Sequence, residues 1–93
     1  MPEPLVSISL FTYNGEKYIK DCLVSVFSQI YSNFEIIVTD NGSTDGTIEI
    51  LKNFQFPISN FQLIFNKKNL GFAAGHNIGI RKSKGEFILC LNQ

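Results

Sequence analysis

Short and longer hydrophobic segments alternate along this chain of 93 residues. The short segments are rich in β-branched residues and are bounded by proline, asparagine or glycine, which is typical of strands. In the longer segments apolar residues recur at every third or fourth position, which is typical of amphipathic helices. The pattern predicts strands over residues 5–11, 34–39, 61–65 and 86–91, and helices over residues 16–30, 44–54 and 72–83.

Strands that alternate with helices predict parallel pairing, with each helix crossing back over the sheet. Because such crossovers are right-handed, the simplest arrangement is a Rossmann-like, three-layer α/β domain with strand order 3-2-1-4. The first two helices then cover one face of the sheet and the third helix covers the other. Ligands of open α/β sheets bind at the carboxyl ends of the strands, where the strand order reverses. We therefore expect a site built from residues 12–16, 40–45, 66–75 and 92–93.

The composition indicates one small globular domain, residues 1–93, without a charge bias. Eight basic and eight acidic residues cancel, so no net field favours a nucleic acid or an anionic membrane as partner. No apolar run approaches the roughly 18 residues that span a bilayer, and no basic segment leads into an apolar one at the N-terminus, so we expect no secretory signal. Both cysteines, Cys22 and Cys90, lie in apolar segments. This predicts buried thiols and a cytoplasmic protein.

The loop after the first strand contains the first candidate ligand-binding residues. Thr12 and Tyr13 offer backbone groups, a hydroxyl and an aromatic face to a nucleotide base, although a plain strand-to-helix turn explains Asn14 and Gly15 equally well. Neither the glycine pattern of a dinucleotide site nor that of a P-loop occurs in the chain. The loop therefore allows a nucleotide site without identifying one.

Asp40 is the more specific candidate, because a carboxylate at the end of a strand can accept hydrogen bonds from a ribose hydroxyl or a base. The alternative is that Asp40, Asn41 and Gly42 only form a turn. We also expect Ser43 to cap the second helix and Asp45 to lie favourably in its first turn. Asp40 is expected to end its strand at the surface, so that its removal spares the fold.

The third helix is unusual in its glycines. Gly71, Gly75 and Gly79 lie four residues apart, on one face, although each glycine inside a helix costs about 1 kcal/mol relative to alanine. They indicate a close approach, either of the helix to the sheet or of the backbone to a bound nucleotide, whose phosphates the helix start would receive. The single histidine, His76, is open to a structural or a functional role.

Together, these segments resemble the nucleotide-binding half of family 2 glycosyltransferases, which have the GT-A fold. The most specific block runs from Asp40 to Thr47, and the segment 69–80 is similar to a rhamnosyltransferase-like branch. The family usually has proline where this chain has Phe11. The matching segments are residues 6–14, 23–29, 34–47, 69–80 and 85–92.

The resemblance implies a glycosyltransferase that inverts the anomeric centre while transferring a hexosyl group from a nucleotide-diphosphate sugar to an acceptor hydroxyl. The acceptor would be a glycan or a lipid-linked saccharide in polysaccharide or cell-surface glycan synthesis, at the inner face of the membrane. Thr12, Tyr13 and Asp40 would hold the base. The residues that we expect to bind the nucleotide-sugar are Thr12, Tyr13, Asn14, Glu16, Asp40, Asn41, Ser43, Gly71, Gly75, His76 and Asn92.

The resemblance also implies a catalytic Mg²⁺ or Mn²⁺ ion, held by an Asp-x-Asp-type motif at the end of the fourth strand. That motif would open at Asn92 and Gln93, with asparagine in place of the first aspartate. We therefore expect a half-domain truncated after strand 4, which retains neither the metal nor a catalytic residue and is inactive alone. Apolar surface beside strands 1 and 4 would be exposed, and the open edge would favour self-association.

Two other hypotheses about the class of protein stay open at this point. The same fold could serve as a nucleotide-binding or interaction module without transfer chemistry. A receiver-like domain would need an acidic cluster after the first strand, where this chain has Thr12 and Tyr13, and an aspartate after the third, where it has Asn66.

Overall fold

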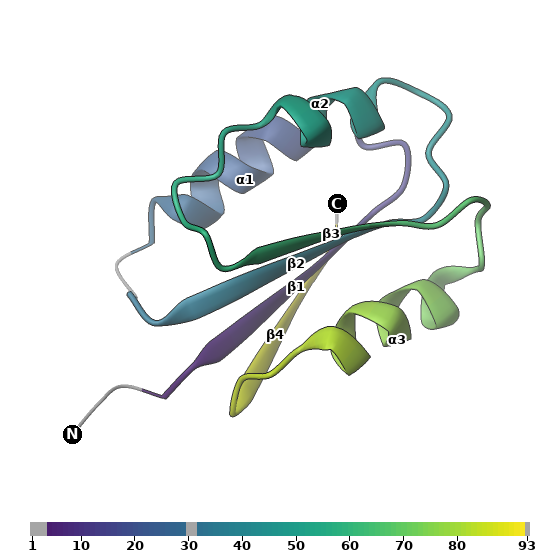
Figure 1. Ribbon diagram of the computed structural model, residues 1–93. Coiled ribbons are helices and arrows are strands. Elements are labelled where there is room, and N and C mark those ends of the chain that lie inside the picture. Colours follow the sequence, from purple (N-terminus) through teal and green to yellow (C-terminus); the bar gives the residue numbers. More distant parts are fainter. Residues whose placement is uncertain (1–3, 30–31, 93) are drawn as a thin grey trace.

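The computed structural model describes residues 4–29 and 32–92, in which strands and helices alternate as predicted (Figure 1). The first two helices begin later than the hydrophobic pattern indicated, because residues 15–18 and 44–46 connect strand and helix, whereas the third begins at Phe72 as predicted. Ile30, predicted at a helix end, and Gln93, predicted in the site, lie outside the described residues. The elements are β1 (Val6–Thr12), α1 (Ile19–Phe27), β2 (Phe34–Asp40), α2 (Thr47–Asn53), β3 (Phe61–Phe65), α3 (Phe72–Lys82) and β4 (Phe87–Asn92).

The four strands form one parallel sheet in the order β3-β2-β1-β4, which confirms the predicted topology. Val6 pairs with Phe34 of β2 on one side and with Phe87 of β4 on the other. Helices α1 and α2 lie on one face of the sheet and α3 on the other, as predicted (Figure 1). The loops that follow β1, β2 and β3 gather at one edge, on the right in Figure 1.

The hydrophobic core lies between the sheet and the layer of α1 and α2. Alternate residues of a strand point to opposite faces, so one side of β1 and β2 is aliphatic. Burial of such side chains is the main favourable term in folding, and this layer therefore holds the domain together. The core residues are Ile8, Leu10, Ile19, Leu23, Val26, Ile36, Val38 and Leu51.

The opposite face of the sheet is small and polar where α3 packs on it. A Cβ atom on Gly79 would clash with the hydroxyl of Ser9 and lie 3.1 Å from that of Thr39. A Cβ atom on Gly75 would clash with the ring of Phe11. These two glycines therefore let the helix approach the strands closely, which is the packing explanation of the glycine spacing.

A buried carboxylate anchors the far end of this layer, at the amino edge of the sheet. Glu35 is only 3% exposed, and its Oε2 accepts hydrogen bonds from the Ser7 hydroxyl and from the backbone N–H of Lys84, at 2.5 and 2.6 Å. Ser7 Oγ also accepts a bond from the N–H of Gly85, at 2.8 Å. The chain between α3 and β4 is thus tied to β1 and β2 by polar contacts.

β4 is the exposed edge strand of the sheet. Phe87 is 60% and Leu89 51% exposed, which confirms the prediction of exposed apolar surface at strand 4, whereas β1 itself is buried. A groove of about 400 Å³ lies between β4 and α1. The prediction of two buried thiols was wrong for Cys90, because the strand that carries it has a neighbour on one side only. Cys22 is partly buried, and burial raises the pKa of its thiol.

Candidate functional site at the carboxyl edge of the sheet

The sheet directs the ends of β1 and β2 to the same edge, where Thr12 lies opposite Asp40 in the strand register. Asp40 is completely buried. Its two oxygens accept hydrogen bonds from the N–H and the hydroxyl of Ser43, at 2.9 and 2.5 Å. The expectation of a surface aspartate was therefore wrong, because the turn that follows folds back over the carboxylate.

Ser43 does not cap the second helix, contrary to the sequence prediction. α2 begins at Thr47, and its N-terminal boundary residue is Gly46. The Ser43 hydroxyl instead donates to Asp40 and accepts a bond from the N–H of Asn14, at 2.8 Å. The position of the helix explains the difference: Ser43 lies three residues before Gly46, so its hydroxyl accepts a bond from an N–H of the neighbouring loop instead of one from the first turn of α2.

Thr12 provides an unusual polar group in this part of the molecule. Its hydroxyl oxygen is buried and has no hydrogen-bond partner among the described residues. Buried polar groups almost always have a partner, so this hydroxyl at the end of β1 is unusual in having none among the described residues. Thr39 has the same property, but its hydroxyl lies under α3, near Gly79.

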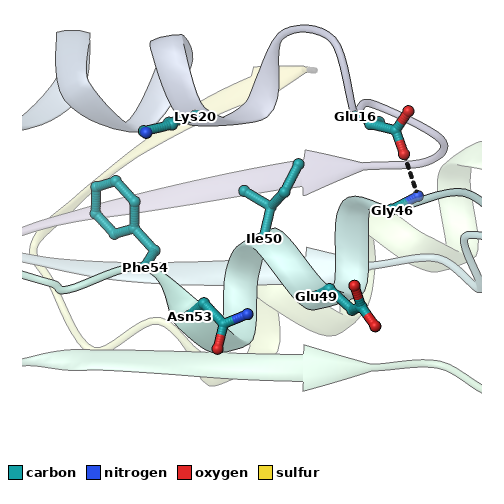
Figure 2. A pocket seen from close by; sticks show the side chains of 7 residues that line it. All are labelled: Glu16, Lys20, Gly46, Glu49, Ile50, Asn53 and Phe54. Carbon is teal, nitrogen blue, oxygen red and sulfur yellow. Dashed lines mark hydrogen bonds between the residues drawn. The ribbon is translucent and has the colours of Figure 1, made fainter.

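The loops after β1 and β2 are joined by further bonds. Asn14 has a positive φ of 49°, and its Oδ1 accepts a bond from the N–H of Thr44 at 2.8 Å. The carboxylate of Glu16 accepts a bond from the N–H of Gly46 at 2.6 Å (Figure 2). These contacts use polar groups that the sequence alone had offered for a nucleotide, and they hold the two loops as one unit.

Asp45 completes that unit from the second loop. It accepts bonds from the hydroxyl and N–H of Thr47, and from the N–H of Glu16 at 3.2 Å. Desolvation tends to raise the pKa of this carboxyl group, but the hydrogen bonds from Thr47 and Glu16 outweigh it, and the pKa is lowered. Asp45 was expected in the first turn of α2, but it precedes the helix.

A hollow of about 430 Å³ lies between α1 and α2, next to this pair of loops. Figure 2 shows Ile50 and Phe54 of the α2 segment pointing toward α1, with Lys20 above them. Among the described residues, the charged and amide groups at its rim converge on no single point. The hollow thus contributes no group to the carboxyl-edge site apart from Glu16, which lies on its border.

Asn41 connects the second loop with the third. Its side chain is buried, and its Nδ2 donates to Asn69 Oδ1 at 2.9 Å and to the carbonyl of Gly71 at 3.3 Å. Its Oδ1 accepts bonds from Asn66 Nδ2 at 3.0 Å and from the N–H of Leu70 at 3.2 Å. Sequence reasoning predicted Asn41 as a ligand-binding residue but missed this connecting role, for which the asparagines of the third loop were the only signal.

The remaining predicted residues lie at the start of α3 and at the end of β4. Gly71 has a positive φ of 88°, and its N–H donates to Asn69 Oδ1 at 2.7 Å. Gly75 is buried against Phe11, whereas His76 reaches Asn92. Tyr13, the first residue of the loop after β1, is 38% exposed. The fold thus brings the predicted residues to one edge, but their roles toward a ligand stay predictions.

The metal prediction was tested on the donor groups that are present. Within residues 4–29 and 32–92, no three His, Cys, Asp or Glu side chains lie together as a metal site would require. Asn92 is the one predicted motif residue among them, and its amide oxygen is engaged by His76. These residues therefore do not form a Mg²⁺ or Mn²⁺ site by themselves, and the metal prediction concerns a longer protein. No helix in this part of the chain has the length and hydrophobicity needed to span a membrane.

The parallel order β3-β2-β1-β4, which reverses between β1 and β4, is that of a Rossmann-like α/β fold. The sequence profile described as "Glycosyl transferase family 2" matches residues 7–93. The chain therefore belongs to glycosyltransferase family 2, and its fold is the N-terminal part of a GT-A domain, as predicted.

Individual relatives agree with this assignment. An uncharacterized glycosyltransferase of Haemophilus influenzae is 40% identical over 92 residues, which are 99% of this chain and 37% of that protein. The glycosyltransferase AglE of Haloferax volcanii is 37% identical over 91 residues, which are 96% of this chain and 30% of that protein. The rhamnosyltransferase-like branch stays a prediction.

Two solved structures have the same fold. Staphylococcus aureus TarS 1–349 in complex with UDP-GlcNAc has a TM-score of 0.84 at 31% identity. The mannosyltransferase PcManGT from Pyrobaculum calidifontis, in complex with GDP-Man and Mn²⁺, has a TM-score of 0.86 at 27% identity. Each match covers 94% of this chain and 26% of the other. This chain thus spans between about a quarter and somewhat more than a third of the four relatives described.

Proposed function

We propose that residues 1–93 form the donor-nucleotide part of an inverting hexosyltransferase. The single observation that carries the proposal is the buried, unpartnered hydroxyl of Thr12, next to Asp40 at the carboxyl edge of a family 2 fold. A hydroxyl in this position is satisfied when a ligand donates to it or accepts from it. Solved structures with the same fold were obtained with UDP-GlcNAc and with GDP-Man. The ligand class is therefore a nucleotide-diphosphate sugar.

The residues around Thr12 have two kinds of role in this proposal. Tyr13, partly exposed, offers its ring to the base. Asp40 accepts hydrogen bonds from Ser43 and keeps acceptor capacity for a ribose or base donor. Asn14 and Glu16 act mainly through the other loop, because their side chains bond to the backbone after β2. They shape the site more than they contact the nucleotide.

We extend the proposal to the longer protein as follows. It transfers its sugar to a glycan or lipid-linked saccharide, at the cytoplasmic face of the membrane, with Mg²⁺ or Mn²⁺ to neutralise the departing diphosphate and a carboxylate to deprotonate the acceptor hydroxyl. Residues 4–29 and 32–92 contain no three-residue cluster of metal-binding side chains. The 93-residue chain by itself is therefore expected to bind nucleotide without turnover.

Thr12→Val tests the binding site against a matched control, Thr39→Val. Both threonines bury an unpartnered hydroxyl, but only Thr12 lies at the carboxyl edge of the predicted site. Titration calorimetry with UDP, dTDP and GDP should give a Kd about 2- to 10-fold higher for Thr12→Val, the value of one hydrogen bond. Thr39→Val should bind like the wild type. Equal effects of the two variants, or no nucleotide binding by the wild type, would contradict the proposal.

Transfer is tested on the longer protein. Release of nucleoside diphosphate from a panel of UDP-, dTDP- and GDP-sugars should depend on added Mg²⁺ or Mn²⁺ and disappear with EDTA. The 93-residue chain should release none under the same conditions. If the longer protein binds nucleotide but transfers no sugar to any acceptor, a binding module without transfer chemistry is the better description.

We also propose that the chain self-associates through β4. The strand has no charged residue between Phe87 and Asn92, and an open, uncharged edge strand invites pairing with another copy. Light scattering should report a mass that rises with concentration for the wild type and stays at that of a monomer for Leu89→Lys. A wild-type monomer at high concentration would contradict this part of the proposal.

A further inference from the structure

A contact between α3 and β4 closes the carboxyl edge of the sheet. The Nε2 atom of His76 lies 2.5 Å from Oδ1 of Asn92. The two residues are 16 positions apart in the sequence, and they come from a helix and a strand that are joined at the opposite edge of the sheet. The contact therefore links the start of α3 to the end of β4.

The imidazole of His76 is held by two aromatic rings. It stacks on Phe11 with a centroid distance of 4.7 Å and an interplanar angle of 15°, and it contacts Phe72 at 4.5 Å and 54°. Phe11 is buried at 8% exposure. Gly75 makes room for its ring, because a Cβ atom there would clash with it. The position of His76 is thus set by the end of β1, where this chain has phenylalanine.

We propose that His76 is a positioning residue that turns the side chain of Asn92 so that its NH₂ group, and not its oxygen, faces the nucleotide site. Oδ1 of Asn92 is the acceptor of the bond from His76 Nε2–H, which leaves the Nδ2 hydrogens of the same amide as its free donors. No described residue accepts a bond from Nδ2. The group it suits is an anionic oxygen of the donor diphosphate.

This inference rests on the proposed function for its ligand, but not for its geometry. An amide oxygen is a normal ligand of hard cations, and one that already accepts a hydrogen bond from a histidine is less available for that task. Asn92 therefore contributes to diphosphate binding as a hydrogen-bond donor, independently of a metal ion. Phe11 and Phe72 act indirectly, because they orient the imidazole of His76.

The geometry is tested on the wild-type chain by nitrogen-15 NMR. The imidazole of His76 should carry its proton on Nε2, and the side-chain amide signal of Asn92 should move in His76→Phe, which retains an aromatic ring to stack on Phe11 but has no Nε2. The amide signal of Asn77, the exposed neighbour of His76 on α3, should not move. A neutral imidazole protonated on Nδ1, with Nε2 accepting from the Asn92 amide, would overturn the proposal.

The consequence for binding is tested with UDP in the absence of divalent metal. Asn92→Ala and His76→Phe should each raise the Kd by about 2- to 10-fold, the value of one hydrogen bond. The double variant should be no weaker than Asn92→Ala, because His76 acts through Asn92. Asn92→Asp keeps the acceptor for His76 but lacks the NH₂ group, so it should bind no better than Asn92→Ala.

The matched control is Asn77→Ala, which should bind UDP like the wild type. Circular dichroism melting establishes that each variant is folded at the temperature of the titration. Additive effects of His76→Phe and Asn92→Ala, or UDP binding by Asn92→Asp as tight as by the wild type, would refute the positioning role. A wild type that binds no nucleotide would refute the proposed function, while the NMR result would still decide how His76 orients Asn92.

Discussion

The two faces of the sheet differ in chemistry and in what they do. Under α1 and α2, strands β1 and β2 present leucine, isoleucine and valine, and Leu10, Ile36 and Val38 are at most 1% exposed. Under α3 the same two strands present serine, threonine and one glutamate beside the larger Phe11 and Ile37, and the helix packs on them through Gly75 and Gly79. The first face excludes water and supplies the free energy of folding. The second allows close approach and is held by hydrogen bonds.

This difference explains where the candidate site lies. A helix that approaches the strands through glycine can bring its first turn to the ends of β1 and β4, as His76 does at Asn92. The aliphatic layer on the other side keeps β1 and β2 in register, so that Thr12 and Asp40 stay opposite each other. Stability and site geometry are therefore largely separate properties of this domain, and substitutions should distinguish them.

The largest effect is expected when the aliphatic face is weakened. Leu10 is completely buried in the aliphatic core. Its neighbour Ser9 is also buried, but on the other face of the sheet, under α3. Leu10→Ala should lower the free energy of unfolding by about 2–5 kcal/mol, because it leaves a cavity in the core. Ser9→Ala should cost less than about 1 kcal/mol, because it removes one hydroxyl. Urea denaturation followed by circular dichroism gives both values, and equal losses would contradict the contrast between the faces.

The next effect concerns the one carboxylate that ends a strand on the aliphatic face. Asp40→Ala leaves the N–H and hydroxyl of Ser43 without their acceptor. Because hydrogen bonds to charged groups are worth about 1.5–3 kcal/mol, the free energy of unfolding should fall by that amount. Ser43→Ala in the Asp40→Ala background should add little, since the pair acts together. An unchanged melting temperature for Asp40→Ala would mean that the turn does not need the carboxylate.

On the polar face, Gly79→Ala should lower the free energy of unfolding by about 1–3 kcal/mol, because the added methyl group overpacks the contact with Ser9 and Thr39. Removing the Ser9 hydroxyl should relieve part of the clash. The double variant Ser9→Ala, Gly79→Ala should therefore melt at a higher temperature than Gly79→Ala alone. If Ser9→Ala gives no rescue, α3 does not approach the strands as closely as the structure places it.

The smallest effect is a pH dependence that arises in the joined loops. The hydrogen bonds to Asp45 lower its pKa in the folded state, so the folded protein binds this proton less readily than the unfolded chain. The stabilisation is present above the pKa of an unfolded aspartate, about 3.9, and is lost as the pH falls through the lower folded value. Asp45→Asn should reduce the acid sensitivity of the melting temperature below about pH 4, without moving the pKa of Cys22. If the melting temperatures of the wild type and of Asp45→Asn depend on pH in the same way, Asp45 is not the source of the acid sensitivity.

Much of the architecture was readable from the chain because it depends on local periodicity and handedness. Alternating short and long apolar segments predicted each strand and helix, and right-handed crossovers predicted the order of the strands. The position of the site followed, since the loops after parallel strands meet at one edge. Family motifs between Asp40 and Thr47 then identified the class of protein.

What a side chain does at that edge was decided by contacts between residues distant in the sequence. Ser43 was predicted to cap a helix, yet its hydroxyl donates a hydrogen bond to the buried carboxylate of Asp40. Asn41 looked like part of a turn, yet it joins two loops.

The sequence by itself therefore determined the elements, their order and the family of this protein, because repeating patterns and motifs are local. Only the tertiary structure decided which polar groups are bonded within the protein and which, such as the hydroxyl of Thr12, have no partner among the described residues. The physical reason is that a buried polar group takes the nearest partner that the fold provides, and residues 28 to 30 positions apart become neighbours only after the sheet has formed.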